Sequence, residues 1–124
     1  MTAARKGFTL IELLIVVVII GIIASIAIPK FANTKEQAYI ASMKSDLRNL
    51  MSAQEAYYAD NGLVYAPSTT ALGTTYKSSA GVVVTLYRVT ATGWRATAQH
   101  PSTTHYCRIY LGTISRVDGA TVCF

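Results

Sequence analysis

An unbroken apolar block near the start of the chain extends from Leu10 to Ile28, and its aliphatic run is interrupted only by Glu12, Gly21 and Ser25. As an α-helix, the slightly longer segment from Phe8 to Ile28 would extend about 31 Å, the thickness of a bilayer's hydrocarbon core. A helix that is apolar on every face lies in lipid or among other helices. We therefore expect residues 8–29 to cross a membrane or to pack among copies of the same segment.

Beyond Pro29 the apolar residues become periodic. They recur at spacings of three and four, which is typical of one face of an amphipathic helix: Ile40, Met43, Leu47, Leu50, Met51, Tyr57 and Tyr58. The polar residues between them are expected on the solvent side: Lys44, Asp46, Arg48, Asn49 and Glu55. Gly62 follows Asn61 and is expected to end the amphipathic segment 30–62, because glycine readily takes the left-handed conformation. The pattern predicts one nearly continuous helix from about Phe8 to Asp60.

Residues 63–124 show the alternation that is typical of β-strands. The Ser/Thr-rich segment 63–81 is expected to be a connecting loop. Strands are predicted at 82–90, 94–99 and 106–111, with a last short strand that carries Cys123 and turns at 91–93 and at Asp118-Gly119. Trp94, Ala96 and Ala98 are expected on the inner face. The fold class is therefore α+β, with a long N-terminal helix whose amphipathic half packs against a small antiparallel sheet.

Composition limits the protein to about one domain and excludes a polytopic membrane protein. The chain has 124 residues, of which 14% are charged, below the roughly 25% that is usual for soluble domains. The net charge is +5, but Arg5 and Lys6 precede the apolar block and the other basic residues are scattered. No basic run alternates with aromatic residues as a nucleic-acid groove would require. We expect a mildly basic, solvated surface.

Cys107 and Cys123 are the two cysteines of the chain. Neither belongs to a CxxC motif, and only His100 and His105 could join them, which disfavours zinc. We expect a disulfide, formed in an oxidising compartment. Asp118 is the single acidic residue of segment 63–124, so no catalytic group is recognised. We therefore expect neither an enzyme nor a bound cofactor or metal.

Glu12 is an unusual residue for an apolar block. Ala24, Ser25 and Ala27 could imitate the cleavage site of a secretory signal peptide, so an ordinary signal peptide is one alternative. Glu12 argues against it, because a signal peptide needs no carboxylate there and a carboxylate at the centre of a membrane helix costs about 2.5–3.5 kcal/mol. With no basic residue in its own span, the carboxylate requires a cation from elsewhere. The alternative is that Glu12 only caps the first turn of its own helix, where the helix dipole favours a negative charge.

The run from Lys6 to Leu13, Lys-Gly-Phe-Thr-Leu-Ile-Glu-Leu, resembles the class III signal of type IV prepilins and pseudopilins. The resemblance continues through the aliphatic residues to Gly21 and the sequence Ile-Pro-Lys-Phe at 28–31. It covers about the first quarter of the chain, and the remainder matches only in layout.

The resemblance implies a pilin fold and a defined maturation. A prepilin peptidase would cut between Gly7 and Phe8, remove the leader 1–7 and methylate the new amine of Phe8. Glu12 would pair with the Phe8 amine of a neighbouring subunit during assembly. The helix between the two helix-breaking positions Gly21 and Pro29 could lose its order in a filament.

Three functions follow as hypotheses. The first is the major pilin of a type IV pilus, a helical homopolymer that supports motility, adhesion or DNA uptake. The resemblance then implies an inner-membrane precursor, an extracellular pilus, and an assembly ATPase and membrane platform as partners, besides the peptidase. The head, residues 63–124, would contact surfaces or DNA, with Arg108, Arg116 and Lys77 as a basic surface. The second is a type II secretion major pseudopilin, which would usually carry a calcium loop and often no disulfide. The third is a single-pass anchored periplasmic binding module.

Overall fold

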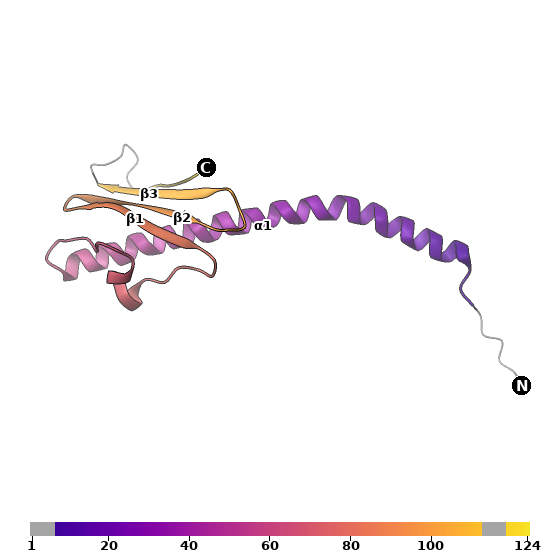
Figure 1. Cartoon of the computed structure of the whole chain (residues 1–124), viewed down its shortest axis with the longest axis horizontal. Coiled ribbons are helices and arrows are strands. Elements are labelled where there is room, and N and C mark those ends of the chain that lie inside the picture. The colour runs from indigo at the N-terminus through magenta and orange to yellow at the C-terminus, as the bar shows by residue number, and fades with distance from the viewer. Residues whose placement is uncertain (1–6, 113–118) are drawn as a thin grey trace, which may run out of the picture. The chain divides into compact units, whose positions relative to one another are not determined.

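A long helix and a four-stranded antiparallel sheet make up the fold (Figure 1), and the predicted α+β class is confirmed. The computed structural model describes residues 7–112 and 119–124. In chain order the elements are α1 (Leu10–Asp60), η1 (Thr70–Thr75), β1 (Val83–Thr90), β2 (Gly93–Gln99), β3 (Tyr106–Gly112) and β4 (Thr121–Cys123). The chain divides into two units, one up to Lys35 and one from Glu36 to Phe124, which are described separately.

The first unit holds the apolar part of α1. The helix begins at Leu10, two residues after the expected start, and it continues through both Gly21 and Pro29. Proline removes one backbone N–H donor and usually kinks or ends a helix, yet α1 does not end there. The single chain thus has the nearly continuous helix that the sequence predicts. The loss of helical order in a packed filament stays a prediction.

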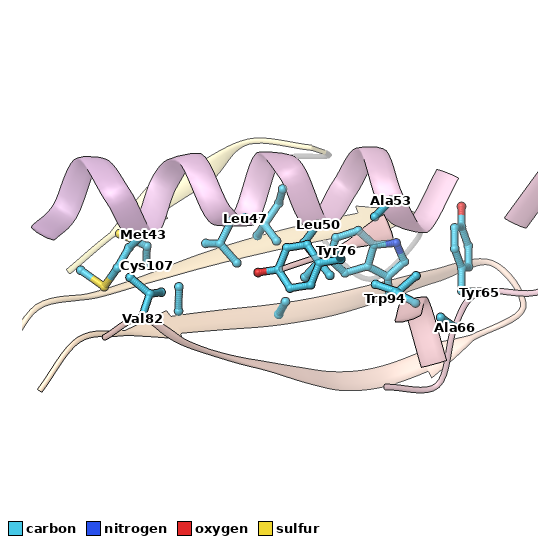
Figure 2. Packing of buried hydrophobic residues seen from close by; sticks show 14 residues of the cluster. Met43, Leu47, Leu50, Ala53, Tyr65, Ala66, Tyr76, Val82, Trp94 and Cys107 are labelled. Atoms are coloured by element: carbon cyan, nitrogen blue, oxygen red, sulfur yellow. The ribbon is translucent and has the colours of Figure 1, made fainter. Parts of the chain in front are cut away.

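In the second unit, α1 packs its apolar face on one side of the sheet. Met43, Leu47 and Leu50 are completely buried and belong to a cluster to which the sheet contributes Trp94 and Cys107 (Figure 2). The predicted face of the helix is confirmed at these positions, while the flanking apolar residues are partly buried: Ile40, Met51, Tyr57 and Tyr58. The helix ends as expected, because Gly62 adopts a positive φ of 69°.

The sheet has the strand order β1-β2-β3-β4, and every neighbouring pair is antiparallel. The predicted strands are confirmed, and most of their observed ends lie within one residue of the predicted ends. The inner positions of β2 are buried as expected. Gly93 and Gly112 face each other across β2 and β3. A Cβ at either position would collide with the backbone of the opposite strand, so this close approach requires glycine.

The connection between the helix and the sheet is more ordered than a loop. It contains η1, and two buried side chains of α1 hold it. The Gln54 amide donates to the Ala66 carbonyl at 3.0 Å and accepts from the Ala66 N–H at 2.9 Å. The Asp46 carboxylate accepts from the Ser79 N–H and from the Ser79 hydroxyl, both at 2.8 Å.

The expectation that Asp46 faces solvent was wrong, since only 2% of the residue is exposed. Its hydrogen bonds to Ser79 satisfy a carboxylate that would otherwise be costly to bury. The helical period could not reveal this, because the partner lies in a segment far along the chain.

The expected disulfide is confirmed. Cys107 and Cys123 are bonded and lie opposite each other in β3 and β4, with their Cα atoms 4.0 Å apart. Tyr106 and Phe124 extend this ladder by two backbone hydrogen bonds. Asp118 and Arg116, which the sequence placed in a turn and on a basic surface, lie outside the described residues.

Candidate processing and assembly site

The start of α1 is a capping box formed by Thr9 and Glu12. The Thr9 N–H and the Thr9 hydroxyl both donate to Oε2 of Glu12, at 2.8 and 2.7 Å, and the Glu12 N–H donates to the Thr9 hydroxyl at 3.3 Å. In this arrangement each residue satisfies a backbone donor that has no partner within the helix. The sequence Thr-Leu-Ile-Glu thus fixes where the helix begins.

This capping box bears on the alternative that Glu12 serves only its own helix. Both bonds from Thr9 use the single oxygen Oε2. The other oxygen, Oε1, takes part in neither bond, and the whole residue is exposed. The carboxylate can therefore cap its own helix and still accept a hydrogen bond from a cation outside the chain. The two roles do not compete for the same atom.

The predicted cleavage site lies immediately before the capping box. Gly7, Phe8 and Thr9 are exposed and lie outside any helix, and the Phe8 residue is 83% exposed. An extended, exposed peptide bond suits proteolysis. A Cβ at Gly7 would meet nothing within 4 Å, so packing within the chain does not require glycine here. A requirement for glycine would come from the protease that reads the segment.

Cleavage between Gly7 and Phe8 would leave the capping box intact, because the Thr9 N–H remains part of a peptide bond. It would also create an amine at Phe8, directly beside the box. The structure thus brings together the two groups that the sequence assigned to assembly, Phe8 and Glu12, at one end of the helix. Cleavage, methylation and pairing between subunits stay predictions.

The apolar part of α1 exposes its side chains in the single chain. Every large aliphatic residue from Leu10 to Ile28 is at least 49% exposed. This helix is long and apolar enough to cross a membrane. Within it, the Ser25 hydroxyl donates to the Ile22 carbonyl at 2.8 Å, so this polar group is satisfied without water, as a bilayer requires.

The head contains one polar cluster that sequence reasoning missed. His105 lies with its Nε2 3.4 Å from Oε1 of Glu36, and its Nδ1 lies 2.8 Å from the Phe124 carbonyl. Thr103 donates to the same Glu36 oxygen at 3.1 Å. No sequence motif joins residues so far apart. Among the described residues, no group of three or more His, Cys, Asp or Glu side chains is placed to hold a metal ion.

Comparisons with known proteins bear directly on the N-terminal segment. Residues 2–28 match the family model described as the prokaryotic N-terminal methylation motif. The chain is 46% identical over 56 residues to the type IV major pilin protein PilA of Myxococcus xanthus, a match that covers 45% of this chain and 26% of that protein. These matches agree with the capping box and the exposed apolar helix. The N-terminal part of the chain carries the methylation motif and is similar to type IV pilins and type II secretion pseudopilins.

Other relatives of the chain divide between two kinds of assembly. It is 43% identical over 60 residues to the type IV major fimbrial protein FimA of Dichelobacter nodosus, covering 48% of this chain and 38% of that protein. It is 39% identical over 57 residues to the type II secretion system core protein G of Pseudomonas aeruginosa, covering 46% of this chain and 40% of that protein. The matches thus span less than half the length of each relative.

Proposed function

We propose that the protein is the major subunit of a type IV pilus, which polymerises through its apolar helix. The observation that carries the proposal is the exposed apolar surface of α1, which begins at a capping box with an accessible carboxylate. Such a surface is stable in a bilayer or against copies of itself, and water offers it neither environment. Self-assembly through this helix also explains why a carboxylate, Glu12, lies in an apolar segment.

Glu12 sets the register of the helices in this proposal. The methylated amine of Phe8 on an incoming subunit pairs with Oε1 of Glu12 on its neighbour, inside an apolar bundle where the attraction is little screened. A carboxylate left unpaired in that environment is strongly unfavourable. One axial position of the two helices is therefore favoured over the others.

Two features of the head favour a pilus over a secretion pseudopilus. The resemblance associates major pseudopilins with a calcium-binding loop, and calcium requires several oxygen ligands, chiefly carboxylates. Segment 63–124 holds one acidic residue, Asp118. The disulfide between Cys107 and Cys123 supports the same choice.

A type II secretion major pseudopilin is the second candidate, and the relatives include that class. A single-pass anchored binding module is a third and gives Glu12 no role.

The proposal includes partners and a location. A prepilin peptidase cuts after Gly7, the inner membrane holds the subunit through residues 8–29, and an assembly ATPase with its membrane platform extracts it. The assembled filament is extracellular and supports motility, adhesion or DNA uptake. The subunit is a structural protein without catalytic activity of its own.

Mass spectrometry of the mature protein tests the processing step. We expect the chain to begin at Phe8 with a methylated amine. A mature end near residue 28 would show ordinary signal cleavage and would overturn the proposal.

Electron microscopy of filaments sheared from cells then separates a pilus from a secretion pseudopilus, because a pilus yields long surface filaments in which this chain is the main protein. Its absence from such filaments would favour the pseudopilus.

A further inference from the structure

The face of the sheet turned away from α1 carries a shallow hollow of about 260 Å³. Side chains alternate between the two faces of a strand. Trp94 packs beneath the helix (Figure 2), and Ala96 and Ala98 are buried in the same cluster, so their neighbours in β2 point the other way. The hollow is lined by six residues from three strands: Tyr87, Arg95, Thr97, Gln99, Tyr106 and Arg108.

Strand register brings these residues together from distant parts of the sequence. Tyr87 of β1 lies opposite Arg95 of β2, and Arg108 of β3 lies opposite Thr97 of β2. Arg95 and Arg108 are therefore diagonal neighbours on one face, a relation in which Cα atoms are about 7–8 Å apart. Two arginines thus line one hollow from the same face of adjacent strands.

Aromatic rings hold both guanidinium groups in place. The Arg95 guanidinium lies over the Tyr87 ring, 5.7 Å from its centroid. The Arg108 guanidinium lies 4.7 Å from the Tyr106 centroid and 5.9 Å from the Phe124 centroid. Stacking engages the flat face of a guanidinium and leaves its N–H donors at the edge free for a carboxylate. Because the side chains are already positioned, less entropy is lost on binding an anion.

Among residues 7–112 and 119–124, no acidic side chain is paired with these donors. None of the six lining residues is acidic, and in the described part of the chain neither arginine belongs to an ion pair. Thr97 and Gln99 supply a hydroxyl and an amide, which donate and accept hydrogen bonds. The hollow thus combines two fixed positive charges with neutral polar groups.

We propose that this hollow binds a carboxylate-bearing sugar unit of an acidic polysaccharide. A guanidinium recognises a carboxylate through two parallel hydrogen bonds, and the neutral groups suit sugar hydroxyls. A nucleic acid fits less well. One face of each tyrosine ring is already covered by a guanidinium, and the hollow is too small to admit a duplex. The chemistry offered is therefore recognition of charge and hydroxyl groups, without base stacking.

The inference rests on the proposed function for one point, the strength of attachment. A single shallow site binds weakly, but a filament repeats the site along its length. Linked sites gain about 10²–10⁴-fold in avidity over one site. Binding by a single subunit does not depend on assembly, so it is measured on the unassembled protein.

The test uses the full mature chain, with its disulfide intact, in a nonionic detergent. Titration calorimetry compares short alginate oligomers, which carry one carboxylate per sugar, with the same oligomers after reduction of their carboxyl groups to alcohols. We expect binding to the acidic oligomers and at least tenfold weaker binding to the reduced ones. Arg95→Gln and Arg108→Gln should each weaken binding about tenfold, and the double variant should abolish it.

Arg48→Gln is the matched control, because it removes the same charge at an exposed position on α1 and should leave binding unchanged within about twofold. Arg108→Lys keeps the charge without the planar fork and should bind with intermediate strength. Fluorescence of Trp94, the single tryptophan, verifies that each variant is folded.

Three results would overturn the inference: equal binding of reduced and acidic oligomers, equal weakening by Arg48→Gln, or tighter arginine-dependent binding to a DNA duplex or to phosphatidylglycerol vesicles. None of these results would affect the proposed function, because the measurement involves no filament.

Discussion

Thr9 and Glu12 share one hydrogen-bonded turn, yet they should differ in their effect on assembly. Thr9→Ala removes the helix cap, at a cost of about 1 kcal/mol, and keeps the carboxylate. Glu12→Ala removes both the cap and the charge. If the carboxylate sets the register of neighbouring helices, only Glu12→Ala should lower the filament yield by about tenfold or more, the effect of losing about 1.4 kcal/mol or more per subunit.

Filament yield is measured from sheared surface fractions of cells that express and process equal amounts of each variant. Membrane insertion should be kept in both, since removing a carboxylate lowers the cost of inserting the helix. Equal yields from the two variants would show that Glu12 acts only as a cap.

Tyr76 makes the head sensitive to alkaline pH. Burial, and secondarily the nearby Asp46 carboxylate, raise the pKa of the Tyr76 hydroxyl above its usual range. Because the pKa is higher in the folded state, the stability due to the protonated phenol is complete below pH about 10 and is lost as the pH rises above that value. The free energy of unfolding should therefore fall more steeply above pH 10 in the natural protein than in Tyr76→Phe.

At neutral pH the same substitution should leave the head as stable or about 1 kcal/mol more stable. The reason is that the Tyr76 hydroxyl is buried and, within the described residues, makes no hydrogen bond. Urea unfolding followed by Trp94 fluorescence measures both effects, with Tyr87→Phe at an exposed position as the control for losing a phenol. Parallel pH profiles for the natural protein and Tyr76→Phe would contradict the prediction.

At the scale of single residues, sequence reasoning succeeded where a motif or a period fixes the position. The buried Met43, Leu47 and Leu50 belong to that group, whereas the role of Glu12 in assembly stays a prediction. Asp46 does not, because its partner Ser79 lies in a segment that has no period of its own. The sequence assigned Arg108 to a basic surface but gave it no relation to Arg95, and only the pairing of β2 with β3 places these two together.

At the scale of elements, the disulfide should be the main covalent support of the short strand β4. Strand β4 has three residues and pairs only with β3 among the described strands. Closing the loop between Cys107 and Cys123 is worth about 3 kcal/mol on the chain-entropy model. Replacing both cysteines by alanine should lower the free energy of unfolding of the head by about that amount, as measured by urea unfolding.

A reductant provides the control for this prediction. It should destabilise the natural protein and leave the double alanine variant unchanged. An unchanged unfolding midpoint for the reduced natural protein would show that strand pairing alone holds β4.

The elements themselves were largely predictable, because α1 and the strands have strong periods and clear turn residues. The ordered turn η1 was not, since the segment 63–81 is rich in serine and threonine and has no repeating apolar spacing. Its position depends on the side chains of Gln54 and Asp46, which reach it from α1. Contacts of this kind are tertiary and leave no local signal.

At the scale of the whole molecule, the sequence predicted the family and the candidate site because both lie in one contiguous segment, residues 2–28. The choice between a pilus and a pseudopilus depends on the head, where evidence is spread over separate strands and a loop. For the same reason the candidate sugar site could not be foreseen from spacing alone.

The exposed apolar helix also has a consequence for how a filament would be dismantled. If the proposed filament releases a subunit into water, the aliphatic side chains of residues 10–28 would be exposed, so the bilayer is the stable destination for it. Shortening a filament would then refill the membrane reservoir with intact, already processed subunits. A cell could regrow the structure by recycling them, without new synthesis, and the size of that reservoir would limit the length it can reach.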